Sequence, residues 1–97
     1  MSESNSAIAN GTPRVVMYAT GWCGYCARAR ALLESKNVTF EEIDVDTQPE
    51  LRAEMMTRSG RRTVPQIFIG ETHVGGCDEL MQLEATGRLD PLLKQGS

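Results

Sequence analysis

The chain has no apolar run long enough to cross a membrane and no excess of basic residues. Its longest apolar stretches, such as Val15–Ala19, fall far short of the roughly 20 residues that a membrane-spanning helix needs. The 97 residues carry 10 lysines and arginines against 13 aspartates and glutamates, a net charge of −3. Proteins that bind nucleic acid or anionic membranes normally present a basic surface. The composition therefore argues against both kinds of partner.

The N-terminus also lacks the basic segment and apolar core of a secretory signal peptide. The chain has three cysteines, and an odd number does not suit the disulfide scaffold of a small exported protein. We therefore expect a cytoplasmic protein whose cysteines are reduced, reactive or metal-binding. Two of them, Cys23 and Cys26, are separated by two residues, whereas Cys77 stands apart.

The first 13 residues are polar, with Ser, Asn, Gly, Thr and Pro around an isolated Ile8. Such a composition predicts a disordered leader or a remnant of cloning. The rest of the chain contains no internal repeat and no second boundary, so we expect one domain over residues 14–97. A domain of this size buries only about 60–70% of the surface that its unfolded chain exposes, so its core is thin.

The spacing of apolar residues predicts alternating strands and helices. The strands are expected at residues 15–19, 38–45, 64–69 and 73–75, and the helices at 23–36, 47–60 and 77–87. Because the apolar positions of 38–45 change parity, we expect helices over both faces of that strand. Asp90 and Pro91 should cap a final short turn that ends at Leu93.

Two local patterns support these boundaries. Thr47 to Glu50 form a capping box with a proline in the first helical turn, which predicts the start of the second helix. Gly70 and Glu71 suit a two-residue hairpin turn. The order β-α-β-α-β-β-α predicts parallel strands joined by right-handed crossovers, followed by an antiparallel hairpin. This α/β arrangement, a four-stranded mixed sheet flanked by helices, resembles the thioredoxin-like fold.

The cysteine pair lies directly after a predicted strand, where a helix begins. One helical turn brings two Cα atoms into the range of roughly 4.4–6.8 Å that a disulfide needs. The unpaired amides and the dipole of a helix N-terminus favour an anion, and thiols placed there titrate at roughly 3.5–7.5 instead of about 8.5. Cys23 is therefore predicted to be the nucleophile and Cys26 the resolving thiol.

A Cys-x-x-Cys pair can also be half of a zinc site. Four ligands would require Cys77 and the only histidine, His73, to converge on the pair. We interpret His73 instead as an ordinary exposed strand residue, because it lies on a predicted strand near a turn. The redox interpretation is therefore favoured over the zinc site.

Four segments of the chain are informative in combination. They are CGYC at 23–26, RSG at 58–60, TVPQIFI at 63–69 and GGCD at 75–78. Together they resemble the glutaredoxin family, and the match covers nearly the whole domain. Their combination is much more specific than the cysteine pair alone, and it is most similar to the short bacterial-type dithiol glutaredoxins.

The resemblance implies a groove that binds glutathione. Pro65 would be a cis-proline facing the active cysteine, and the backbone of Val64 would pair with the extended tripeptide like an added strand. Amides at the second helix terminus would hold the γ-glutamyl carboxylate, while Asp78 would accept from its ammonium group. Either Arg61 or Arg62 would meet the glycine carboxylate. The implied glutathione-binding set is Tyr25, Arg61, Arg62, Thr63, Val64, Gly76, Cys77 and Asp78.

Several of these residues also have simple structural interpretations. An acidic Asp78 in a first helical turn is favourable without any ligand. Arg58, Arg61 and Arg62 could form a solvated helix end, and Cys77 is interpreted as a small buried residue that lines the groove.

The activity implied is that of a glutathione-dependent thiol–disulfide oxidoreductase. Cys23 alone would reduce glutathione mixed disulfides, and Cys23 with Cys26 would reduce protein disulfides. The expected partners are glutathione and proteins that carry glutathione or a disulfide, and the expected state is a monomer. A thioredoxin-type reductase is less favoured, because Tyr25 stands where thioredoxins have proline.

Three residues depart from the common pattern of the family. Thr20 replaces a lysine, which removes a cation beside the thiolate, while Trp22 replaces a small residue and Gly24 replaces proline. Such replacements around the first cysteine resemble glutaredoxins that hold a [2Fe–2S] cluster between two protomers. Each protomer there contributes one active-site thiolate and one glutathione. The alternative function is therefore cluster binding or transfer by a cluster-bridged dimer, with Cys23 as the ligand.

Overall fold

The computed structural model describes residues 8–9 and 12–95. Most of the predicted leader, residues 1–7 and 10–11, lies outside this part, as do residues 96–97. The described part of the leader forms two short strands, β1 (Ile8–Ala9) and β2 (Thr12–Pro13), which pair antiparallel. The domain boundary at residue 14 stays a prediction.

Four further strands form the mixed sheet that the pattern predicts, in the order β4-β3-β5-β6. β3 (Val15–Ala19) runs parallel to β4 (Phe40–Asp44) and antiparallel to β5 (Gln66–Ile69). β5 continues into β6 (Thr72–Gly75), its antiparallel neighbour. The thioredoxin-like α/β class is confirmed.

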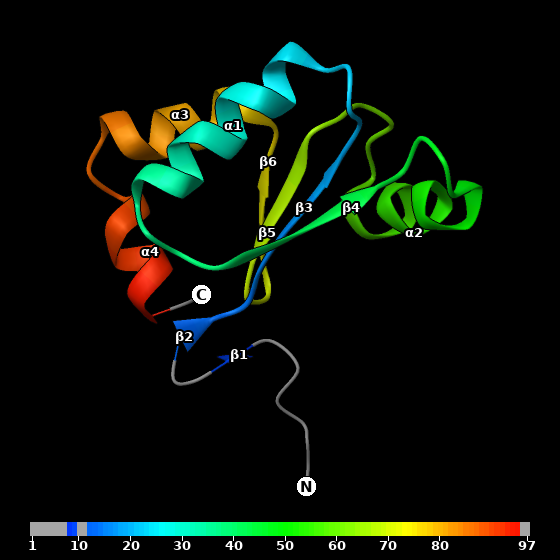
Figure 1. Cartoon of the computed structure of the whole chain (residues 1–97). Helices are drawn as coiled ribbons and strands as arrows, with labels where there is room; N and C mark the ends of the chain where they lie inside the picture. The colour runs from blue at the N-terminus through cyan, green and yellow to red at the C-terminus, as the bar shows by residue number, and fades with distance from the viewer. Residues whose placement is uncertain (1–7, 10–11, 96–97) are drawn as a thin grey trace, which may run out of the picture.

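Helices cover both faces of this sheet (Figure 1). α1 (Gly24–Ser35) and α3 (Cys77–Ala85) lie on one face, and α2 (Pro49–Ser59) lies on the other. α4 (Leu89–Gln95) packs beside α3 at the lower end of the first face. Within the described part of the chain, no helix has the length and apolarity that crossing a membrane requires.

The sheet separates two apolar cores. The side chains of β3 are all buried and alternate between them, so that Met17 enters the larger core beneath α1, α3 and α4, and Tyr18 the smaller core beneath α2. The Tyr18 hydroxyl donates to Glu54 and accepts from Arg58 Nη1 at 2.7 Å, which satisfies a polar group in a buried side chain. Full burial on both faces explains why this strand is continuously apolar.

The end of the chain differs from its prediction. Residues 89–95 form α4, not a short turn that ends at Leu93. Leu89 and Leu93, spaced one helical turn apart, are both buried in the larger core. Burial of this narrow apolar stripe stabilises a helix that local sequence signals alone did not indicate. With β1 and β2 at the start, the element order is therefore longer than predicted at both ends.

One local expectation was wrong, and a second was confirmed. α2 begins after Gln48, which makes no side-chain capping bond, so Thr47 does not form a capping box. β4 contacts both cores, as its change of parity predicted, although it is an edge strand whose acidic residues are exposed. Its change of parity arises because Phe40 packs against the larger core and Ile43 against the smaller one.

The hairpin prediction is confirmed. Gly70 follows β5 directly with a φ of 60°, and one further residue separates it from β6. A residue in this left-handed region at the first turn position favours glycine. The turn sends the chain back toward the end of the sheet at which β3 finishes.

The larger core gives a direct test of the packing. Replacing Leu33, which is 0% exposed, with alanine should lower the free energy of unfolding by about 2–5 kcal/mol. Leu32 is half-buried on the same helix, so Leu32→Ala is the matched control and should cost clearly less. Urea unfolding followed by circular dichroism measures both. Equal losses in the two variants would contradict the assigned position of Leu33.

Candidate active site

Cys23 lies at the N-terminus of α1, four residues beyond the last residue of β3. It is the N-cap, with extended backbone angles, and its sulfur accepts a hydrogen bond from the Cys26 amide at 3.2 Å. The sulfur is also 3.8 Å from the carbonyl oxygen of Val64. Cys23 is partly exposed, so its sulfur is both reachable from solvent and held by a helix amide.

Cys26 is buried, whereas Cys23 is partly exposed. The Cys26 side chain is 0% exposed. Burial, followed by its hydrogen bond with the Cys23 side chain, raises the pKa of Cys26 to about 12. It therefore remains a neutral thiol at physiological pH, while the partly exposed sulfur beside it is accessible. The two cysteines thus differ in access, and burial opposes ionisation of the inner one.

A groove of about 240 Å³ brings together residues from three separate parts of the chain. The Val64–Pro65 peptide bond within it is cis, as the resemblance implied. All residues of the implied glutathione-binding set line the groove except Arg62. The lining comprises Tyr25, Arg61, Thr63, Val64, Pro65, Gly76, Cys77, Asp78 and Glu79.

The structure separates the two arginines that the sequence could not distinguish. Arg61 lines the groove and pairs with Glu79, with 3.5 Å between Nη2 and Oε2. Arg62 is exposed and does not line the groove, and its carbonyl oxygen accepts from Arg52 Nη1 at 3.4 Å. Arg61 is therefore the cation that the groove presents.

Glu79 is a groove residue to which sequence reasoning assigned no ligand role. Its Oε1 accepts from the amide of Gly76, the N-cap of α3, at 2.7 Å. This backbone hydrogen bond is the main cause that lowers the pKa of Glu79, and Arg61 adds to it. The signal was present in the sequence, because a glutamate three residues after an N-cap commonly bonds back to it. The Gly76 amide is thus already occupied, whereas the amides of Cys77 and Asp78 are first-turn donors without helical acceptors.

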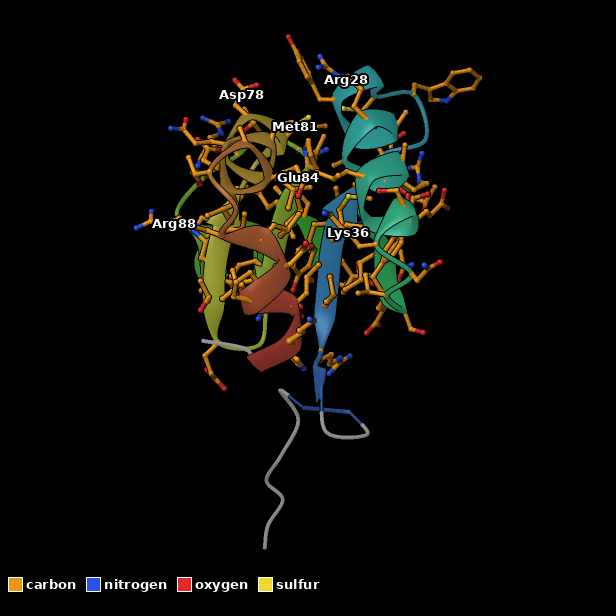
Figure 2. The ribbon with its side chains drawn as sticks, turned by 90° about the vertical axis from the view of Figure 1, so that its left-hand side faces the viewer. Arg28, Lys36, Asp78, Met81, Glu84 and Arg88 are labelled. Atoms are coloured by element: carbon orange, nitrogen blue, oxygen red, sulfur yellow. The ribbon has the colours of Figure 1, made fainter. Side chains whose placement is uncertain are left out.

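Cys77 and Asp78 differ sharply in exposure at this second helix terminus. Cys77 is 4% exposed, and burial raises the pKa of its thiol. Asp78 is exposed, and Figure 2 shows it at the same upper end of the molecule as Arg28 of α1. The groove therefore has a neutral wall at Cys77 and an anionic group at its rim.

His73 is not the exposed strand residue that the sequence suggested. It is half-buried, its Nε2 lies 2.7 Å from Oε1 of Gln66, and its ring stacks on Phe68 with centroids 4.8 Å apart. Its partner is thus an amide in the sheet. Residues 8–9 and 12–95 contain no group of three His, Cys, Asp or Glu side chains placed to hold a metal ion.

The three departures from the common pattern all lie around the cysteine pair. Trp22 is 95% exposed, and a side chain at Gly24 would meet open space. The backbone of Thr20 forms a hydrogen bond with Cys26. These positions therefore present an aromatic surface and no cation next to Cys23.

Comparisons with known proteins agree with this geometry. The glutaredoxin family model matches residues 15–74. A curated glutaredoxin from Pseudomonas aeruginosa is 60% identical over 81 residues, covering 84% of this chain and 96% of the relative.

Two solved structures share the fold. The solution structure of glutaredoxin from Brucella melitensis has a TM-score of 0.80 and 57% identity, covering 90% of this chain and 95% of the other. The crystal structure of a buckwheat glutaredoxin–glutathione complex has a TM-score of 0.79 and 33% identity, covering 90% and 81%. With its cysteine pair on a helix terminus beside the cis-proline loop, the chain belongs to the glutaredoxin family of thiol–disulfide oxidoreductases.

Proposed function

We propose that the protein reduces glutathione mixed disulfides and protein disulfides, with glutathione as the reductant. The observation that carries this proposal is the groove beside Cys23. It presents a cation, Arg61, the first-turn amides of α3 and an anion, Asp78. Glutathione is an extended peptide with two carboxylates and one ammonium group, so the signs of charge match. The similarity to a glutaredoxin solved with glutathione supports the same ligand.

The first route uses one cysteine. The Cys23 thiolate attacks the glutathione sulfur of a mixed disulfide, the target protein leaves as a thiolate, and Cys23 becomes glutathionylated. A second glutathione thiolate then attacks the glutathione sulfur on Cys23. Glutathione disulfide leaves, and the Cys23 thiolate is restored. In this groove the bound glutathione would lie along Val64, whose carbonyl oxygen is 3.8 Å from the Cys23 sulfur.

The second route adds Cys26. When Cys23 is in a mixed disulfide with a target protein, the Cys26 sulfur attacks Cys23 and the target leaves as a dithiol. Cys26 must lose its proton first, and its high pKa keeps the reserve thiol unreactive until the neighbouring disulfide has formed. Glutathione then reduces the bond between Cys23 and Cys26. Glutaredoxin potentials of roughly −200 to −230 mV lie close to the cytosolic glutathione poise, which makes that reduction feasible.

The proposed partners follow from these routes. They are glutathione and proteins that carry a glutathione adduct or an accessible disulfide, and the proposed working state is a monomer. A reducing cytoplasm supplies the glutathione that both routes consume.

Serine substitutions separate the two routes. Cys26→Ser should retain reduction of a glutathione mixed disulfide, because only the Cys23 sulfur attacks in that route, but it should lose reduction of protein disulfides. Cys23→Ser should lose both activities. A coupled assay with glutathione and glutathione reductase measures each rate. Mixed-disulfide reduction by the Cys23→Ser protein would refute the assigned nucleophile.

The variant Thr20→Lys tests whether a cation at position 20 favours ionisation of the active-site thiol. A lysine beside the cysteine pair should favour the thiolate and shift the alkylation of the active-site thiol by iodoacetamide to lower pH. Thr20→Met is the matched control, because it adds a long side chain without a charge. The measurement is the alkylation rate as a function of pH for all three proteins. Superimposed profiles for Thr20→Lys and Thr20→Met would contradict the electrostatic argument.

A second candidate function, binding of a [2Fe–2S] cluster, is supported by the exposure of the thiols. Clusters of this type are held by four thiolates. Within one chain, Cys23 is partly exposed, whereas Cys26 is 0% and Cys77 4% exposed. One accessible thiol per chain fits a shared cluster held by two protomers and two glutathiones. Trp22, 95% exposed beside this thiol, would face the second protomer.

Anaerobic reconstitution tests this candidate. The protein is incubated with iron, sulfide and glutathione, then passed through a sizing column with absorbance detection. A coloured dimer that is lost in Cys23→Ser and retained in Cys26→Ser would support the shared cluster. A colourless monomer would contradict it.

A further inference from the structure

A chain of hydrogen bonds runs from Thr63 in the groove, through Gln66 of β5, to His73 of β6. Gln66, the first residue of β5, is 0% exposed, so its side-chain amide must find partners within the protein. Its Nε2 donates to the carbonyl oxygen of Thr63 at 3.0 Å and to the Thr63 hydroxyl oxygen at 3.3 Å. Its Oε1 lies 2.7 Å from Nε2 of His73 on β6.

These partners determine the direction of every bond in the chain. The carbonyl oxygen of Thr63 can only accept, so the amide nitrogen of Gln66 must face Thr63. The Oε1 atom then faces His73 and needs a donor, which requires the proton of His73 to be on Nε2. Burial, followed by the charge of Arg61, lowers the pKa of His73, so its ring carries a single N–H at neutral pH. The single ring proton of His73 is therefore on Nε2, which donates it to Oε1 of Gln66.

At the groove end of this chain of hydrogen bonds, the Thr63 hydroxyl is left as a donor. Because the Thr63 hydroxyl accepts from Gln66, its own proton remains free to be donated elsewhere. Thr63 is exposed and lines the same groove as Arg61. A hydroxyl donor beside a guanidinium suits a carboxylate.

We infer that Gln66 and His73 are positioning residues that present the Thr63 hydroxyl as a donor to a ligand carboxylate in the groove. This inference rests on the proposed glutathione activity. The ligand carboxylate is the glycine carboxylate of glutathione, which Arg61 would also meet. His73 acts on Gln66, and Gln66 acts on Thr63 and on the loop that leads to Val64. The stack of His73 on Phe68, with Arg58 4.1 Å from the Phe68 ring, holds the imidazole in place.

Two His73 variants separate hydrogen bonding from packing. His73→Phe keeps an aromatic ring for the stack but removes the donor, whereas His73→Gln restores a donor at the same side-chain position. His73→Phe should raise the KM for a glutathione mixed disulfide by about 3- to 10-fold, the range expected for one lost hydrogen bond. The kcat and the iodoacetamide alkylation rate of Cys23 should stay at wild-type values. His73→Gln should return the KM toward wild type.

Thr63→Val provides a second test that does not depend on the sheet. Thr63 is exposed, so the variant should fold, and its KM should rise by about the same factor. If His73 acts through Thr63, the double variant should show the KM of Thr63→Val alone rather than the product of the two effects. A substrate whose glycine carboxyl group is esterified should show smaller effects in all variants.

The outcomes separate this inference from the proposed function. A wild-type KM in His73→Phe, an equal rise in His73→Gln, or multiplicative effects in the double variant would each overturn the positioning role while the oxidoreductase activity stands. A wild-type protein that does not reduce the glutathione mixed disulfide would refute the proposed function, and this inference with it.

Discussion

The candidate site depends on the register of three strands. β3 and β5 are antiparallel, with Tyr18 opposite Gln66, and β5 and β6 are antiparallel, with Ile67 opposite Gly75. The last residues of β3 and β6 and the first residue of β5 therefore lie at one end of the sheet. Cys23, the loop before β5 and the N-terminus of α3 all extend from that end. Burial of β3 in both cores holds this register, because a slip by one residue would exchange the two apolar faces.

The same arrangement gives two identical side chains different chemistry. In α1 the N-cap lies at the end of the helix, where solvent reaches it, whereas the residue three positions later lies in the core. Cys23 thus remains accessible at the terminus of α1, while Cys26 is buried in the larger core with its pKa raised to about 12. Desolvation, together with the hydrogen bond to the Cys23 side chain, opposes ionisation of the inner thiol. In the proposed mechanism, the core that stabilises the domain also determines the order in which the thiols react.

The sequence predicted those parts of the site that local chemistry specifies. A cysteine pair at a strand–helix junction and a glycine pair before an acidic helical turn carry their meaning in a few neighbouring residues. The same holds for the hairpin at Gly70. The capping box expected at Thr47 was a local error, whereas the larger errors fall where distant residues decide. α4 exists because Leu89 and Leu93 meet a core built elsewhere, and His73 is half-buried because the hairpin stacks it on Phe68. Arg61 lines the groove and Arg62 does not, and the partner of Arg61 there is Glu79, which lies far along the chain.

Glu79 also shows how a charged groove can be stable before its ligand arrives. An unpaired donor near a protein surface loses solvation when a groove forms around it, and such a loss opposes folding. Here one carboxylate satisfies both the Gly76 amide and Arg61, so two of the donors are held in place by the protein itself. A ligand carboxylate then meets an arginine that is already positioned, together with the amides of Cys77 and Asp78. Less side-chain freedom is lost on binding, which favours affinity without any additional contact.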